Sequence, residues 1–175
     1  MADIGGRGGA SGLSQNKIGS ELEKIRNAAK ENLRVFDSNG NLIYSEGGTK
    51  GHTGYSNVDY EGKIVAHNHP KGYAPYPSGT DFDTFQNHNA KEMIIVSKDY
   101  TVSVRRDPSF KSLSGIRESI SYAAQSMGER SILTQARKDV RERKISVQQA
   151  NERILEFYKK VTKRAGYIME VRKKK

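Results

Sequence analysis

The sequence predicts an α/β protein, in which a mixed β-sheet is flanked by helices and followed by a basic helical extension. Short apolar, largely β-branched runs such as Met93-Ile94-Ile95-Val96 indicate buried strands. Apolar residues spaced three and four apart, near the start of the chain and again after residue 112, indicate amphipathic helices. The balance of charge changes at about residue 105, which distinguishes the basic extension from the rest.

The first half of the chain reads as a helix followed by a hairpin. A helix over 17–30 is indicated by apolar residues on one face and by the capping-box spacing of Ser20 and Glu23; the apolar residues are Ile18, Leu22, Ile25 and Ala29. Strands at 33–36 and 42–44 flank an Asn-Gly turn, the pair that favours a tight hairpin. The Gly-, Ser- and Thr-rich stretch 45–60 is predicted to be a loop.

The middle of the chain predicts the remaining strands of the core. A central strand over 63–69 runs into a Pro/Gly-rich loop at 70–79, and a short helix fits 81–90. The continuous apolar run 93–96 is typical of a buried strand, and 101–104 alternates as its edge partner.

The last third is predicted to be mostly helical. A helix from about residue 112 would carry Ile116, Ile120, Ala123, Ala124 and Met127 on one face, and a second would cover 130–143. A third begins at Ser146, which has capping-box spacing to Gln149, and stops at Gly166. A final strand is predicted at 167–171.

Length and composition restrict the class of protein. The 175 residues suffice for one domain with a core, and the apolar fraction is 34% with a mean hydropathy of −0.78. The absence of cysteine excludes disulfides and thiolate metal sites. No apolar run approaches the roughly 20 residues of a membrane span, and the start lacks a signal-peptide pattern, so we expect a cytoplasmic protein without membrane contact.

Charge divides the chain unevenly. We expect a flexible Gly-rich segment at 1–13, a core at 14–106, and a basic helical extension at 107–175. Residues 1–104 carry 11 Lys+Arg and 12 Asp+Glu, a balance of −1, whereas 105–175 carry 19 and 8, a balance of +11. This asymmetry indicates either an anionic partner, such as weakly and non-specifically bound nucleic acid, or a solvated helical surface.

The stretch from His67 to Asp81 carries the residues for metal chemistry. Residues i and i+2 of a strand point to the same face, so His67 and His69 can present two imidazoles to one ion. Pro70 ends the strand, and the loop that follows can return Asp81 as a third ligand. Two imidazoles and one carboxylate leave a tetrahedral position open, which is typical of a catalytic zinc site.

This pattern, His-x-His-Pro followed by a loop and Ser-x-x-Asp, resembles the metal signature of the JAB/MPN/JAMM metallopeptidases. This form of the motif is most similar to that of RadC-like members and of JAB domains from phages and mobile elements. The resemblance covers roughly residues 17–106. It departs from the family at one point, because eight residues rather than seven separate His69 from Ser78.

The resemblance implies a JAB/MPN-like fold with cytidine-deaminase-like layering. It also implies that zinc is bound by His67, His69 and Asp81, that Ser78 stabilises the oxyanion, and that an upstream glutamate is the general base. Glu31 follows the first predicted helix at the start of the first strand, as the family's glutamate does, and we prefer it to its rival Glu46.

The expected activity is zinc-dependent hydrolysis of a peptide or isopeptide bond in a protein or peptide substrate. Two other classes remain open: a nucleic-acid-associated module, and a phage or mobile-element assembly component that uses the JAB fold for binding. The sequence identifies neither the substrate nor the oligomeric state. Tyr73 and Tyr76, in the Pro/Gly-rich loop at 70–79, could either receive a peptide or cover the core.

Overall fold

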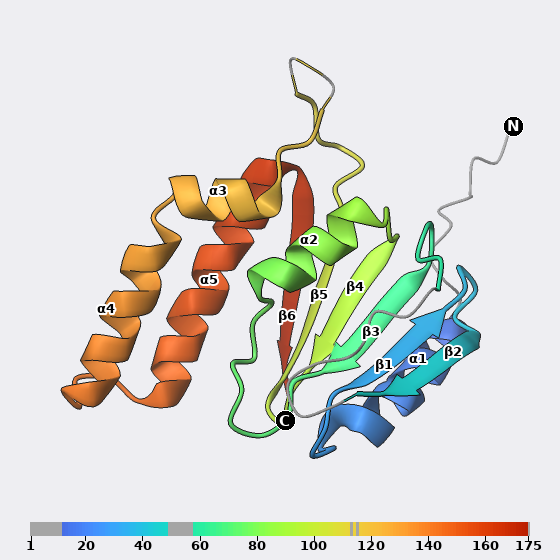
Figure 1. Cartoon of the computed structure of the whole chain (residues 1–175), viewed down its shortest axis with the longest axis horizontal. Coiled ribbons are helices and arrows are strands. Elements are labelled where there is room, and N and C mark those ends of the chain that lie inside the picture. The colour runs from blue at the N-terminus through green and yellow to red at the C-terminus, as the bar shows by residue number, and fades with distance from the viewer. Residues whose placement is uncertain (1–11, 49–57, 113, 115, 175) are drawn as a thin grey trace, which may run out of the picture.

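A single mixed β-sheet forms the centre of the molecule (Figure 1). The computed structural model describes residues 12–48, 58–112, 114 and 116–174. Among these the strand order is β2-β1-β3-β4-β5-β6, with β3 and β4 parallel and the other neighbours antiparallel. The strands are β1 (Asn32–Phe36), β2 (Leu42–Gly47), β3 (Ile64–Asn68), β4 (Glu92–Val96), β5 (Tyr100–Arg106) and β6 (Tyr167–Lys173). The predicted α/β class with a mixed sheet is therefore confirmed.

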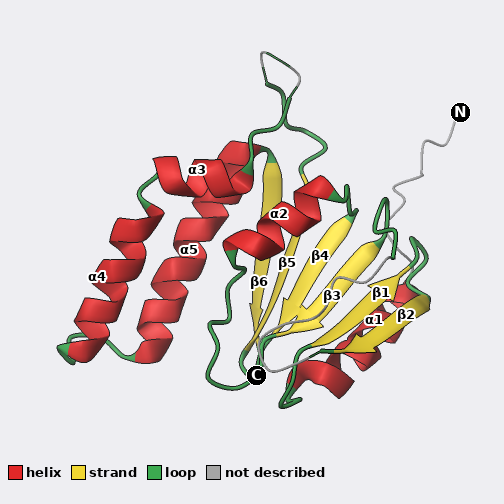
Figure 2. Cartoon of the chain, viewed as in Figure 1, coloured by secondary structure: helices red, strands yellow, loops and turns green. Residues whose placement is uncertain are grey.

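Helices cover the two faces of this sheet unequally (Figure 2). They are α1 (Gly12–Arg26), α2 (Gly79–Asn87), α3 (Ile120–Ser126), α4 (Glu129–Arg141) and α5 (Val147–Ala165). One face packs against α1, and the other packs against α2, α3 and α5, with α4 lying on α5. None of the helices in the described part of the chain is long and apolar enough to cross a lipid bilayer.

Two apolar clusters follow from the alternation of side chains along the strands. On the α2 side, strand residues such as Leu33 and Val65 pack with Phe82 of α2 and Tyr158 of α5. On the α1 side, a smaller cluster joins two residues of the helix to the sheet; its members are Leu22, Ile25, Phe36, Ile64, Ala66, Ile94 and Val96. The sheet therefore separates a large core from a small one.

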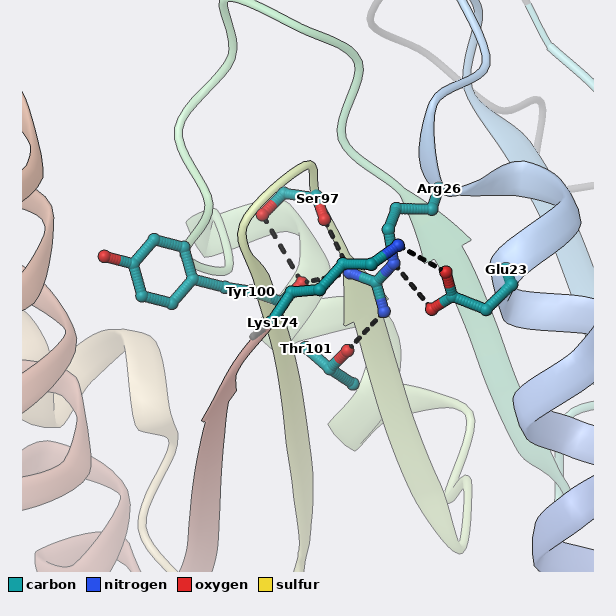
Figure 3. Close-up of polar contacts among 6 residues, drawn as sticks. All are labelled: Glu23, Arg26, Ser97, Tyr100, Thr101 and Lys174. Atoms are coloured by element: carbon teal, nitrogen blue, oxygen red, sulfur yellow. Dashed lines mark hydrogen bonds and ion pairs between the residues drawn. The ribbon is translucent and has the colours of Figure 1, made fainter.

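A buried arginine holds the end of α1 against the β4–β5 turn (Figure 3). The Arg26 guanidinium donates to the carbonyl oxygens of Ser97 (2.6 Å) and Tyr100 (2.9 Å) and to the hydroxyl of Thr101 (2.8 Å). Glu23 lies 2.7 Å from Arg26 and also 2.7 Å from Lys174, directly after β6. Polar contacts thus connect the first described helix, the turn and the end of the last strand.

Three helix predictions were wrong in their boundaries, and one of them is the helix expected at 81–90, which spans Gly79–Asn87. The first helix spans Gly12–Arg26, not 17–30, so Ser20 lies inside it and does not cap it. Of the flexible segment predicted at 1–13, residues 12 and 13 belong to this helix, and residues 1–11 fall outside the described residues. The helix expected from about 112 begins only at Ile120, after the N-cap Ser119. The Arg117 guanidinium instead donates to the carbonyls of Gly166 and Asp107, which holds the preceding segment against the end of α5.

The later elements agree with their predictions. Ser146 caps α5 in a reciprocal capping box with Gln149, and Gly166 ends that helix with a φ of 88°. The predicted final strand is β6, which pairs with β5 along its whole length. The C-terminal third therefore supplies helices and also an edge strand of the common sheet. Of the predicted loop 45–60, residues 45–47 belong to β2, and 49–57 lie outside the described residues.

Candidate metal centre

The two predicted ligand histidines lie at the carboxyl end of β3, on the α2 side of the sheet. His67 pairs with Leu33 of β1, and Leu33 belongs to the large core. The His69 amide donates to the carbonyl of Val96 at 2.8 Å, so strand geometry continues one step beyond β3. His67 and His69 therefore point to the same face, as the spacing predicted.

Three side chains meet at this point. The Nε2 atoms of His67 and His69 are 3.2 Å apart, and they lie 3.2 Å and 3.7 Å from the two carboxylate oxygens of Asp81. All three residues are buried, and their ligand atoms fall within 4.8 Å of one another. This cluster could hold a metal ion.

The loop 70–77, between His69 and the N-cap of α2, fixes the orientation of His69 and is called the ligand loop. Nδ1 of His69 lies 2.6 Å from the carbonyl oxygen of Ala74. Because a carbonyl can only accept, the proton must be on Nδ1, and in the neutral ring Nε2 then carries a lone pair directed at His67 and Asp81. A ligating histidine usually donates its other ring N–H to a carboxylate, a backbone carbonyl or water, and His69 has such a carbonyl.

The pKa values within the cluster reflect mutual attraction between the charged groups. Burial raises the pKa of Asp81, but His67 and His69 outweigh it and hold that pKa well below its usual value. Burial lowers the pKa of His69, but Asp81, the Ala74 carbonyl and the charge of Glu31 leave it above its usual value. Asp81 is therefore an ionised acceptor at neutral pH.

Asp81 is brought to the histidines by the cap of α2. Ser78 is the N-cap, and its hydroxyl accepts from the Asp81 amide at 3.2 Å. In return, the amide and hydroxyl of Ser78 each donate to Oδ2 of Asp81 at 2.7 Å. The Ser-x-x-Asp pattern is thus a capping box that anchors the far end of the loop. The hydroxyl proton of Ser78 is directed at Asp81, and its role as oxyanion donor stays a prediction.

The two candidate general bases, Glu31 and Glu46, lie at different distances from the candidate ligand histidines. Leu33 pairs with His67 in an antiparallel register, so Glu31, two residues earlier, falls opposite His69 on the same face. Glu31 is 9% exposed, and its charge raises the pKa of His69. Glu46 pairs with Leu33 from the edge strand β2, one strand further away, and accepts from the Tyr44 hydroxyl at 3.0 Å. The register therefore places Glu31 nearer to the histidines.

Asn68, between the two histidines, is a positioning residue that the sequence reasoning missed. Its side chain is fully buried and points away from theirs. The amide oxygen accepts from the Asn32 backbone at 2.7 Å, and the amide nitrogen donates to the Lys30 carbonyl at 3.0 Å. Asn68 thus holds the segment that carries Glu31 against the ligand strand. A polar residue in the middle of a predicted buried strand was the available signal, because a buried amide requires partners.

A pocket of about 140 Å³ lies beside His69, between the ligand loop, the β4–β5 turn and α5. Lys71, Tyr73, Lys98 and Asn151 are among the residues that line it. Tyr73 is 46% exposed, whereas the Tyr76 ring packs 5.7 Å from that of Tyr158. The two tyrosines therefore differ: Tyr73 is available to a ligand, and Tyr76 covers the core.

No family model, curated protein or solved structure matches this chain in the three comparisons made.

Proposed function

We propose that this chain is a zinc-dependent metallopeptidase of the JAB/MPN type that hydrolyses a peptide or isopeptide bond. The observation that carries the proposal is the buried convergence of His67, His69 and Asp81, with His69 already oriented by the Ala74 carbonyl. A mixed sheet with α1 on one face and α2, α3 and α5 on the other supports the proposal at the level of the α/β class.

The ligand set fits zinc. Zinc bonds of about 2.0–2.2 Å to nitrogen and oxygen place tetrahedral ligand atoms about 3.3–3.6 Å apart. The 3.2 Å between the two imidazole nitrogens lies close to that range, and the Asp81 carboxylate approaches them with Oδ1 3.2 Å from His67 and Oδ2 3.7 Å from His69. Two imidazole nitrogens disfavour calcium and magnesium, which prefer oxygen ligands. Three protein ligands also leave the open position of a catalytic site.

The surrounding residues have roles suited to hydrolysis. A zinc ion held by the three ligands supplies Lewis-acid activation of a water molecule and of the scissile carbonyl. Glu31 would take the proton of that water and pass it to the leaving amine. Ser78 would donate its hydroxyl to the developing oxyanion in exchange for its present acceptor, Oδ2 of Asp81. The pocket beside His69, with Tyr73 at its surface, offers space for the substrate chain.

The metal assignment is tested first by metal analysis of the purified chain. We expect about one zinc per chain, lost in the double variant His67→Ala/His69→Ala. Asp81→Asn should weaken zinc binding by tenfold or more, since it removes the only anionic ligand. Asp83→Asn is the matched control, because Asp83 lies on the same helix but bonds to Ser121. Full zinc retention in the histidine double variant would refute the site.

The activity is tested on a proteome-derived peptide library that includes isopeptide-linked lysine peptides. New amino groups should appear with the zinc-loaded chain and disappear with chelator or with the histidine double variant. Folding of each variant is checked by circular dichroism, so that loss of activity is separated from loss of structure. If a zinc-loaded, folded chain cleaves neither linkage, the metal-site assignment is kept and the peptidase proposal is rejected.

A further inference from the structure

The lysines at the C-terminal end do not account for the excess positive charge of the second half. Lys173 lies 3.2 Å from Glu152, and Lys174 lies 2.7 Å from Glu23. On α5, Lys159 pairs with Glu156. These lysines already have acidic partners, so an anionic ligand would have to compete for them.

Among the described basic residues without an acidic partner, which include Lys160 and Lys163 of α5, three lie on α4. Arg130, Arg137 and Arg141 are exposed and, within the described part of the chain, have no acidic partner. Their spacing of seven and four residues places them on one face of the helix, with exposed Thr134 between them. At 1.5 Å per residue, they are about 10 Å and about 6 Å apart along the axis. We call these three residues the α4 arginine stripe.

The acidic residues of α4 are directed elsewhere. Glu129 accepts from the Tyr158 hydroxyl at 2.5 Å, beneath the helix. Asp139 is buried and accepts from Arg153 of α5 and from Gln135, both at 2.7 Å. Neither carboxylate therefore neutralises the stripe, which presents its charge to solvent.

We propose that the α4 arginine stripe binds the phosphate backbone of nucleic acid without reading its sequence. Guanidinium groups bind phosphate oxygens in a bidentate manner, and a threonine hydroxyl can add a further phosphate contact. Contacts of this kind supply affinity but no base readout. The proposal does not depend on the metallopeptidase activity.

The surface of α4 favours nucleic acid over an acidic protein. Protein interfaces generally have an apolar or aromatic centre, whereas nucleic-acid interfaces are polar and strongly positive. The large apolar side chains that are exposed in the described residues all lie off α4: Leu42, Ile43, Tyr73, Ile116, Tyr122 and Val147. The stripe thus offers charge and hydroxyl groups without an apolar anchor.

The stripe borders the ligand loop. Tyr76 of that loop packs 5.7 Å from the Tyr158 ring, and the Tyr158 hydroxyl donates to Glu129, which directly precedes Arg130 on α4. A nucleic acid bound along α4 would therefore pass next to the loop that joins His69 to Asp81.

The test measures binding of the full chain to a labelled DNA duplex of about two helical turns by fluorescence anisotropy, over a range of salt concentrations. Log K should fall linearly with log salt. In Arg130→Gln/Arg137→Gln/Arg141→Gln the affinity at low salt should fall by about tenfold or more, and the slope should become shallower by about 2 to 3, since each phosphate contact contributes about 0.9.

The control Lys30→Gln/Lys91→Gln/Lys111→Gln removes the same charge from exposed sites off α4 and should keep the parent slope. Equal weakening in both triple variants would show a general charge effect and overturn the assignment to α4. Absence of DNA binding by the parent at low salt would also overturn it. So would tight binding of a poly-glutamate peptide that the stripe variant abolishes while DNA binding is unchanged, because the partner would then be an acidic polypeptide.

Discussion

The side-chain oxygen of Asn68 accepts the backbone N–H of Asn32 at 2.7 Å, and this contact joins the strand of the ligand histidines to the segment that carries Glu31. The same side chain bonds to the Lys30 carbonyl. The strand of the ligand histidines and the segment of the proposed base therefore belong to one hydrogen-bonded unit, although Asn32 and Asn68 are 36 residues apart in sequence.

Replacement of Asn68 should separate metal binding from catalysis. Asn68→Ala leaves the Asn32 amide without its partner, which should lower the free energy of unfolding by about 1–3 kcal/mol. The zinc content should remain, but hydrolysis should fall at least tenfold, because Glu31 loses its support. Urea titration, metal analysis and the peptide-library assay measure the three effects. Asn27→Ala, at an exposed position after α1, should change none of them.

Glu31→Gln should retain zinc and lose hydrolysis, since a general base is not a ligand. Gln has nearly the same size as Glu but does not accept the proton. The melting temperature should therefore change little. Metal content and turnover are compared with those of Glu46→Gln. If Glu46→Gln is inactive and Glu31→Gln has normal activity, Glu46 is the general base and the inference from the strand register is wrong.

Glu92 provides a pH-dependent prediction away from the metal centre. It lines a groove of about 340 Å³ between α1 and the sheet, where burial raises the pKa of its carboxyl despite the hydrogen bond with Ser103. A folded-state pKa above the unfolded value favours the folded state at low pH, and this contribution is lost as pH rises through the folded pKa. Glu92→Gln should therefore match the parent near pH 4 and melt at a higher temperature at pH 7.

Calorimetry across this pH range, with Glu61→Gln on an exposed turn as the control, measures the effect. A Glu92→Gln variant less stable than the parent at pH 7 would show that the carboxylate is well accommodated in the groove.

Arg26→Ala should destabilise the fold through the β4–β5 turn. The substitution leaves the carbonyls of Ser97 and Tyr100 without their donor, and we expect a loss of about 2–4 kcal/mol in the free energy of unfolding by urea titration. Lys24→Ala, on the exposed side of the same helix, is the control. If the two variants were equally stable, the contacts in Figure 3 would contribute little to the fold.

The parts of the site that were predictable from the sequence depend on local geometry. The alternation of a strand places His67 and His69 on one face, and Pro70 ends the strand whatever the rest of the chain does. Asp81 returns because Ser78-x-x-Asp81 is also a helix cap, a local signal that was present but was interpreted only through the resemblance. The position of Glu31 before β1 was predicted correctly, although the helix ahead of it ends at Arg26.

The parts that were not predictable depend on contacts between distant segments. The apolar spacing of 116–127 suits a helix, but Arg117 donates to the carbonyl of Gly166, directly after α5, and Ile116 is 73% exposed. The buried position of Arg26 likewise arises from carbonyls more than 70 residues away. No local sequence pattern predicts such partners, because these contacts form only after the sheet has formed.

The pairing of β5 with β6 has a consequence for the order of folding. The 60 residues from 107 to 166 lie between the two strands, so this edge closes a long loop, whereas the hairpins and helices close short ones. We therefore expect α4 and α5 to associate first and β6 to join the sheet late. Until then β5, with Val102 and Val104 in its centre, is an open apolar edge, and aggregation during refolding should begin there.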